Sequence, residues 1–295
     1  MELTNGLVMR LPFDPVTAAA VFTLPDSGGA FDPAFRAYLR DLGRKRPSVL
    51  LFFPPKAAGT YLRAAAIDAA GGQLMRIVHA FGGREPTPYM PTFVRYLQGD
   101  PKEPVMVSHA HMQGFPVNLH FIEALDLKPV IMLRSVPDML FSYLEMLNSE
   151  EVTPELWLNS MVPDTFKRMD FDAQADFIVD MLGPWYASYF ATWLDYAGRT
   201  PSRVCVLRYA DFISEPVNAL ETLLRHSGLE PSRARCEKAL ERTWKERGTW
   251  RFNKGEHGRG ADRLRDRHLE RVQSFLFKHY DLEPYRADLF PQAAT

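Results

Sequence analysis

The sequence lacks the features that mark secreted, membrane-spanning or nucleic-acid-binding proteins. Its two cysteines, Cys205 and Cys236, are too few for a disulfide framework and favour a reducing compartment. No stretch approaches the length of a membrane span, and residues 1–12 lack the basic and then apolar pattern of a signal peptide. The 35 Lys and Arg against 36 Asp and Glu give a net charge of −1, so no overall field attracts nucleic acid or an acidic membrane. We therefore expect a cytoplasmic protein with no nucleic-acid partner and no stable membrane insertion.

Size and composition favour one large globular unit. A chain of 295 residues that is 46% hydrophobic and 24% charged can bury a sizeable core. We expect a single domain over residues 1–295. Residues 1–47 would form an irregular lead-in followed by a helix, and residues 150–200, rich in large aromatic side chains, would form a helical insertion.

Short apolar runs alternate with helical patterns through most of the chain. We expect strands at Ser48–Phe53, Gln73–His79, Pro104–Ser108, Val130–Leu133 and Arg203–Leu207, and helices at Phe31–Leu42, Ala64–Ala70, Ser135–Asn148, Ser214–Ser227, Ser232–Arg247 and Asp262–Tyr280. Residues 80–103 are expected to form a long surface loop, and residues 248–262 a flexible basic loop. The alternation predicts an α/β fold in which helices cover both faces of a central parallel sheet, a three-layer α/β/α architecture. In such sheets ligands bind beyond the carboxyl ends of the strands.

The stretch from Pro54 to Arg63, Pro-Pro-Lys-Ala-Ala-Gly-Thr-Tyr-Leu-Arg, joins the first apolar run to a helical pattern. A strand, a small-residue turn and a helix N-terminus form an anion cradle, because free backbone N–H groups and the helix dipole point at one spot. In the Walker pattern of ATP-binding loops, Lys follows the second Gly and a hydroxyl residue follows Lys. Here Lys56 comes three residues before Gly59, so the cradle is not an ordinary ATP loop. A plain strand-to-helix turn with a surface lysine is the alternative.

Two further basic segments fall where a ligand would lie. Arg134 leaves the carboxyl end of a predicted strand, directly before a helix on which Ser142 can face the same anion. The fixed fork of arginine donors suits phosphate better than the point charge of lysine does. The alternative is a helix-capping Arg134 paired with Asp138. The loop Arg251–Gly260 places basic residues between glycines, which suits either a second phosphate or a solvated surface loop.

Two histidines follow the third predicted strand. On an extended chain His109 and His111 point to the same side. Zinc is disfavoured, because the next carboxylate is Glu123 and no cysteine is near. A strand-end histidine is a natural general base for an acceptor hydroxyl, and a satisfied structural histidine is the alternative, for His111 especially.

Taken together, these segments resemble the sulfotransferases that use PAPS (3′-phosphoadenosine 5′-phosphosulfate). The family's first motif, P-K-S/A-G-T-[TS]-[WY]-L, resembles residues 55–62, and its second, R-x-P-x-D-x-x-x-S-x-[YF], resembles residues 134–143 with one extra residue after Arg134. The late R-K-G-x-x-G loop resembles residues 253–258, and a Y-E-D element near the adenine resembles Tyr209-Ala-Asp211. These motifs reach from residue 49 to 260.

The resemblance implies a P-loop-like sulfotransferase that moves a sulfuryl group from PAPS to a hydroxyl or amine by in-line displacement, without a metal. His109 and Lys56 would be catalytic, with His109 as the base. The cofactor would bind Lys56, Ala57, Ala58, Gly59, Thr60, Tyr61, Arg134, Ser142, Tyr209, Asn253, Lys254 and Gly255. The acceptor, a small molecule, lipid or carbohydrate, would contact His111, Tyr89 and Phe93, and the 150–200 insertion would lie on its side of the site.

Some residues depart from the family pattern. Asn253 stands where the family often has an Arg for the 3′-phosphate, so that role could pass to Arg247, Arg251 or Arg259. Val107 stands where many members carry a second Lys, which places more of the leaving-group stabilisation on Lys56.

Two other functions fit parts of the sequence. A non-catalytic module that binds a nucleotide or a sulfated glycan would use Arg134 and the glycine-rich basic loop equally well, but would need no histidine base. A P-loop kinase shares the fold, but Lys56-Ala57 lacks the hydroxyl after the lysine. The oligomeric state is open, and a homodimer is compatible with the sequence.

Overall fold

The computed structural model describes residues 33–77, 88, 90–100, 102–149, 162–246 and 258–291. Its strands are β1 (Ser48–Leu51), β2 (Gly72–Leu74), β3 (Val105–His109), β4 (Pro129–Leu133) and β5 (Cys205–Arg208). Its α-helices are α2 (Pro33–Lys45), α3 (Gly59–Ala70), α4 (Met90–Gln98), α5 (Pro116–Ala124), α6 (Val136–Asn148), α8 (Phe171–Arg199), α9 (Tyr209–Ser214), α10 (Pro216–His226), α11 (Arg233–Lys245), α12 (Arg259–Arg263), α13 (Asp266–Gln273) and α14 (Arg286–Leu289).

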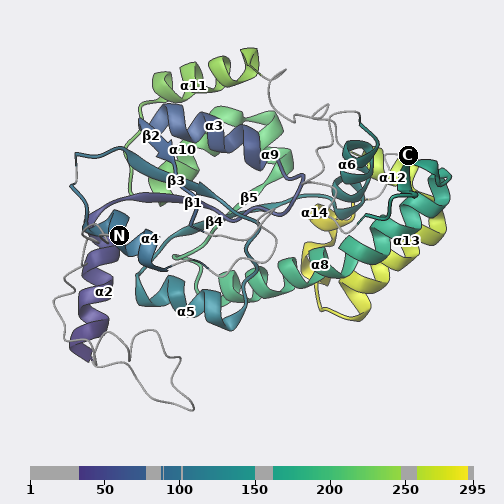
Figure 1. The fold of residues 1–295 in the computed structure, drawn as a ribbon, viewed down its shortest axis with the longest axis horizontal. Coiled ribbons are helices and arrows are strands. Elements are labelled where there is room, and N and C mark those ends of the chain that lie inside the picture. Colours follow the sequence, from purple (N-terminus) through teal and green to yellow (C-terminus); the bar gives the residue numbers. More distant parts are fainter. Residues whose placement is uncertain are drawn as a thin grey trace, which may run out of the picture.

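The five strands form one parallel sheet in the order β2-β3-β1-β4-β5. Helices α3, α10 and α11 cover one face, and α4, α5 and α8 cover the other (Figure 1). Helices α6 and α12 lie together beyond the carboxyl ends of the strands (Figure 1). The expected three-layer α/β/α fold is therefore confirmed. The central strands β1 and β4 are buried along their whole length, as their unbroken apolar sequences indicate.

Helix α6 begins as its sequence predicts. The Ser135 side chain is the N-cap and accepts a hydrogen bond from the backbone N–H of Asp138 at 3.2 Å. Pro137 lies in the first turn, where its missing N–H leaves no helical bond unmade. Gly71 ends α3 in the left-handed conformation, with φ of 62°, which is the helix stop expected there.

The stretch 80–103 is not a surface loop throughout, because it contains the helix α4. The Phe93 side chain is fully buried on α4, with its ring 5.4 Å from that of Phe121 in an edge-on contact. The Tyr96 hydroxyl donates to the Pro47 carbonyl at 2.8 Å and accepts from the Met106 N–H at 2.8 Å. The prolines and glycines of this stretch predicted a loop, but tertiary packing stabilises an amphipathic helix there.

Other local expectations were also incomplete. The expected second strand is shorter than predicted, and the short helices α5, α9 and α12 were not foreseen; α12 occupies the end of the expected basic loop. Helix α8 fits the helical pattern expected for the insertion, although residues 150–161 and 1–32 lie outside the described residues. Within the described part of the chain, no helix is both long and apolar enough to cross a membrane.

Helix α12 packs closely on the N-terminus of α6 through Gly260. A Cβ at position 260 would lie 2.1 Å from the Pro137 carbonyl carbon and 2.4 Å from the Asp138 nitrogen. The Asp138 carboxylate accepts from the N–H groups of Gly258 and Gly260 at 2.9 and 2.7 Å. The sequence left an ion pair between Asp138 and Arg134 as an alternative, and these backbone bonds take its place. They hold Gly258 and Gly260, at the end of the expected basic loop, against α6.

We predict that Gly260→Ala lowers the free energy of unfolding by about 1–3 kcal/mol, because the added methyl group overlaps backbone atoms that cannot turn aside. Gly198→Ala on α8 is the matched control. Nothing lies within 4 Å of its Cβ position, so it should be neutral or stabilise by up to ~1 kcal/mol. Urea unfolding of both variants measures the difference. Equal stability of the two variants would contradict the close packing of α12 on α6.

Candidate active site

The predicted anion cradle lies between β1 and α3. Lys56 and Ala58 both adopt left-handed backbone conformations, with φ of 65° and 61°, and Ala58 is the N-cap of α3. The first helical bond is donated by Leu62 to the Ala58 carbonyl at 3.0 Å. The amides of Gly59 and Thr60 precede that bond and have no intrahelical acceptor. The dipole of α3 and these amides therefore favour an anion at this point.

Two side chains from other elements hold the backbone on either side of Lys56. The Tyr186 hydroxyl of α8 donates to the Pro55 carbonyl at 3.0 Å, and the Arg134 guanidinium donates to the Lys56 carbonyl. These carbonyls belong to the two peptide planes whose orientation defines φ and ψ of Lys56. A left-handed residue other than glycine costs about 1–3 kcal/mol. The two donors offset that cost and fix the shape of the cradle.

Arg134 also joins the cradle to the far edge of the sheet. It follows β4, it is 9% exposed, and its guanidinium carbon lies 3.9 Å from the centre of the Tyr209 ring, which follows β5. Its Nε is buried without a hydrogen-bond partner within the described segments. A buried guanidinium donor normally has an acceptor, so the unpartnered Nε of Arg134 is available to a ligand.

His109 stands at the end of β3 and touches the cradle. It lies beside Leu51 in the sheet register, and its imidazole rests on the Cα of Gly59. A Cβ at position 59 would lie 2.1 Å from Nε2 of His109, so only glycine fits there. That Nε2 is shielded from solvent and has no hydrogen-bond partner among the residues described. The histidine and the anion cradle therefore form one site.

The surroundings of His109 favour its neutral form. Burial, then the nearby positive charges of His111 and Arg63, lower its pKa well below the usual 6.5. The His111 ring meets the His109 ring edge-on at 5.1 Å, and its Nδ1 lies 2.8 Å from the Phe53 carbonyl. A neutral imidazole can accept a proton at pH 7, which is what a general base requires.

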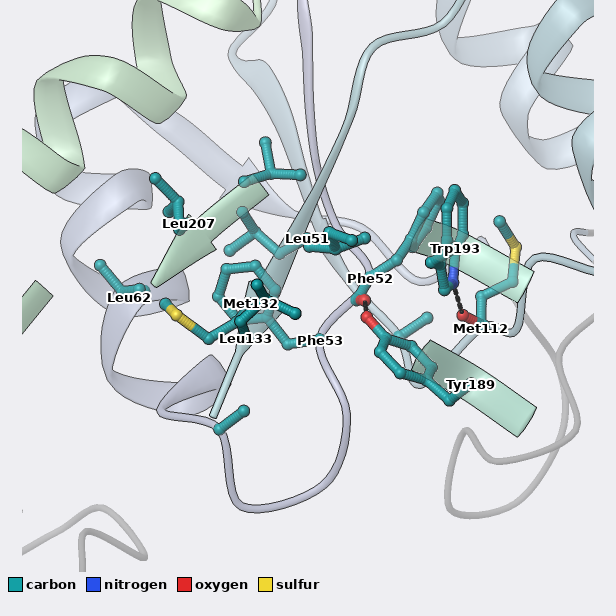
Figure 2. Packing of buried hydrophobic residues seen from close by; sticks show 14 of the residues in the cluster. Leu51, Phe52, Phe53, Leu62, Met112, Met132, Leu133, Tyr189, Trp193 and Leu207 are labelled. Carbon is teal, nitrogen blue, oxygen red and sulfur yellow. Dashed lines mark hydrogen bonds between the residues drawn. The ribbon is translucent and has the colours of Figure 1, made fainter. Parts of the chain in front are cut away.

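The aromatic side chains of α8 anchor the loops of the site. Tyr189 donates to the Phe52 carbonyl, and the Trp193 indole N–H donates to the Met112 carbonyl at 2.7 Å (Figure 2). With Tyr186, these residues lie three and seven positions apart on one face of α8, and all three are fully buried. We expected the insertion that carries these aromatics to lie on the acceptor side of the site; these three side chains hold backbone carbonyls that follow β1 and β3.

The comparisons with known proteins decide the family. The sulfotransferase domain profile matches residues 84–273, which is more than half of the chain. This chain belongs to the sulfotransferase domain family. The sulfotransferase enzyme that the motifs predict is thereby confirmed.

Solved structures of sulfotransferases and of retinol dehydratase match this chain at low sequence identity. The mouse sulfotransferase SULT7A1 complexed with PAP matches with a TM-score of 0.56 and 14% identity, covering 89% of this chain and 98% of that one. Retinol dehydratase in complex with retinol and PAP gives 0.42 and 10%, covering 89% and 88%. A sulfotransferase from Alicyclobacillus acidocaldarius gives 0.40 and 16%, covering 81% and 98%. A search of curated proteins finds no match.

The structure also describes further predicted site residues, in the cradle and on α6. Ala57 is fully buried in its turn, and Ser142 is 4% exposed on α6. The Tyr61 hydroxyl donates to the Leu240 carbonyl at 3.3 Å, and its ring meets that of Trp244, 6.4 Å away, edge-on. The ligand contacts of these residues stay predictions.

The remaining predicted residues divide into two groups. Tyr89, Asn253, Lys254 and Gly255 lie outside the described residues, as do Arg247 and Arg251. Phe93 is a core residue of α4, and Arg259 pairs with Glu145 and lies over the Phe141 ring, 5.2 Å from its centre. In the described segments, no group of three or more His, Cys, Asp or Glu side chains could hold a metal ion.

Two features of the site could not be predicted from the sequence. Nothing near Tyr186 in the sequence shows that its hydroxyl reaches Pro55, 131 positions away. The left-handed conformation of Lys56 is equally hidden, because lysine rarely adopts it. A stripe of large aromatics on one helix face was the available signal, and it fits an anchoring role and a pocket equally well.

We predict that Tyr186→Phe weakens binding of inorganic pyrophosphate to the cradle by roughly three- to tenfold, since one of the two bonds that orient Lys56 is lost. Tyr189→Phe removes a similar hydroxyl from Phe52 and is the matched control. Both should lower the Tm by a similar amount, but Tyr189→Phe should leave pyrophosphate affinity unchanged. Calorimetry and thermal unfolding of the two variants make the test. An equal loss of affinity in both would contradict the role of Tyr186.

Proposed function

We propose that this protein transfers the sulfuryl group of PAPS to a hydroxyl or amine of a small-molecule, lipid or carbohydrate acceptor. The observation that carries the proposal is the contact between His109 and Gly59, because it places a neutral imidazole directly against an anion cradle. Membership of the sulfotransferase family supports the reaction class. The mouse sulfotransferase of the same fold is complexed with PAP, the nucleotide that remains after PAPS has given up its sulfuryl group.

The residues present fit a nucleotide with two anionic ends. The cradle at Lys56–Tyr61 suits the 5′-phosphosulfate, because it offers helix N-terminal amides and a lysine. Arg134 and Ser142 suit the 3′-phosphate, and the buried, unpartnered Nε of Arg134 supports this. Tyr209, under the Arg134 guanidinium, is near enough to meet the adenosine part. The late basic loop, with Lys254 and Gly255, stays a further predicted contact.

The proposed reaction is an in-line displacement at sulfur. The acceptor oxygen forms a bond to sulfur while its proton passes to the imidazole of His109. The bond between sulfur and the bridging oxygen breaks, and its electron pair leaves with the 5′-phosphate. Lys56 stabilises the charge that develops there, and one well-placed donor of this kind contributes roughly 3–4 kcal/mol. Because such a transition state is loose, positioning by the cradle provides much of the catalysis.

The two rival functions are disfavoured by different observations. A kinase loop would need a hydroxyl after the lysine, and this chain has the buried Ala57 there. A binding module would not need a neutral histidine whose Nε2 is unpartnered and touches the cradle. The cytoplasmic location and the absence of a metal requirement stay predictions from the sequence.

We predict that His109→Ala lowers turnover of labelled PAPS by ~10²–10⁴-fold, because the acceptor hydroxyl loses its base. PAP affinity, measured by calorimetry without metal, should remain within about threefold of wild type, since a neutral base adds little to nucleotide binding. His111→Ala is the matched control and should retain far more activity. Loss of PAP binding in His109→Ala, with loss of activity in His111→Ala, would make His111 the base.

We also predict where activity falls at acid pH. A base works only when neutral, and burial with the charges of His111 and Arg63 lowers the pKa of His109. The acid limb of kcat/KM should therefore lie below pH 6.5. His111→Gln removes one of those charges, which favours the imidazolium, so the acid limb should move to higher pH. A pH–rate profile of both proteins measures the shift, and a limb at or above pH 6.5 in wild type would argue against His109.

A further inference from the structure

A pair of arginines lies on the other side of His109 from Arg134. Arg63 is four residues after Gly59 on α3, so the two positions lie on one face of the helix. Since Gly59 touches the His109 ring, Arg63 lies along the same face one turn further on. Its charge acts on His109, and its side chain is half-buried.

Arg76 follows strand β2, which pairs with the strand β3 that carries His109. Strand β2 pairs with β3 so that Leu74 lies beside Val107, and the Met75 N–H continues the ladder by donating to the Val107 carbonyl at 3.0 Å. Arg76 follows Met75 directly, beyond the last paired residue of β2, and its side chain is exposed. The charges of Arg63 and Arg76 act on each other, and burial and Arg76 both lower the pKa of Arg63.

No carboxylate neutralises this pair within the part of the chain that the structure describes. Neither guanidinium forms a hydrogen bond or an ion pair there. The one carboxylate of α3, Asp68, bonds instead to Arg242 at 2.9 Å. Two like charges, one of them half-buried, are unfavourable for the folded protein. Such an arrangement is expected where an anionic ligand supplies the missing charge.

The strand order separates this pair from the proposed nucleotide site. Arg134 and Tyr209 follow β4 and β5 on one side of β1, whereas His109 and Arg76 follow β3 and β2 on the other. A hydroxyl that meets His109 therefore belongs to a molecule whose remainder extends over the β2–β3 side. Arg63 and Arg76 are positioned to contact that remainder.

We propose that the acceptor is an anionic hydroxyl compound, and that Arg63 and Arg76 bind its carboxylate, phosphate or sulfate group while its hydroxyl faces His109. This inference rests on the proposed sulfotransferase function. Arginine suits such oxyanions because its planar donors form paired hydrogen bonds with them.

The first test uses inorganic sulfate as the probe. With PAP at saturating concentration, both phosphate positions are filled, so sulfate titrated by calorimetry can bind only the vacant sulfuryl position or a second anion site, and the arginine variants separate the two. We expect sulfate to bind the wild-type PAP complex, and Arg63→Gln and Arg76→Gln each to weaken that binding at least fivefold while PAP affinity stays unchanged. Arg40→Gln, an exposed arginine on α2, is the matched control and should bind both ligands like wild type.

Stability separates a ligand-binding arginine from a structural one. Because Arg63 and Arg76 repel each other and have no hydrogen-bond or ion-pair partner among the described residues, Arg63→Gln should leave the Tm unchanged or raise it. A structural arginine would lower the Tm on replacement. A lowered Tm with undiminished sulfate binding would overturn the inference.

The second test uses matched acceptors with labelled PAPS. We compare 4-hydroxybenzoate with its methyl ester, and glucose 6-phosphate with glucose, so the two pairs separate a carboxylate from a phosphate. The anionic member of at least one pair should have a tenfold or higher kcat/KM, and Arg63→Gln should reduce that ratio toward one. Preference for the neutral member in both pairs would overturn the inference. Where neither pair is turned over, the sulfate titration decides.

The outcomes distinguish the two proposals. A wild-type protein that binds no PAP overturns the proposed function itself. A protein that binds PAP and transfers sulfate, but whose PAP complex binds no inorganic sulfate, overturns only the anionic acceptor.

Discussion

The site depends on the close approach of His109 to the backbone of Gly59. A side chain at position 59 would overlap the imidazole, so glycine is required for contact rather than for flexibility. The approach also shields Nε2 and contributes to the low pKa of His109. One steric fact thus joins the strand-end histidine to the helix N-terminus, and makes the histidine and the anion cradle parts of a single site.

The conformation of the cradle depends on hydrogen bonds from residues elsewhere in the chain as much as on its own sequence. Lys56 and Ala58 are in a conformation that neither residue favours, and the bonds from Tyr186 and Arg134 hold the peptide planes beside Lys56. Helix α8 supplies one of these bonds and α13 packs against α8 through paired charges, among them Arg265 with Asp172 at 2.6 Å. Distant parts of the chain therefore determine the geometry of the anion site.

The sequence predicted what depends on local patterns and missed what depends on packing. The apolar runs of β1 and β4 and the Ser135 cap of α6 are local, and their elements form as expected. The motifs likewise singled out the turn at Lys56, Arg134 and His109, and the structure places these residues side by side, while their ligand roles stay predictions. In contrast, α4 and the anchoring role of Tyr186 arise from contacts between residues far apart in the chain, which no window of sequence contains. The strand order also depends on contacts between distant residues. It places Arg134 and Tyr209 on one side of β1 and His109 on the other.

That separation has a chemical consequence. Arg134 has a backbone carbonyl and an aromatic ring as partners, whereas Arg63 and Arg76 have no carboxylate partner in the described part of the chain. Arg134 is therefore held in place before any ligand binds, so its ordering adds little entropy loss to binding. In our proposal, the unneutralised charge of Arg63 and Arg76 selects acceptors by charge rather than by shape. In this proposal His109 lies between Arg134 on one side and Arg63 with Arg76 on the other. Because its imidazole is neutral, it can still accept a proton when an anion binds on each side.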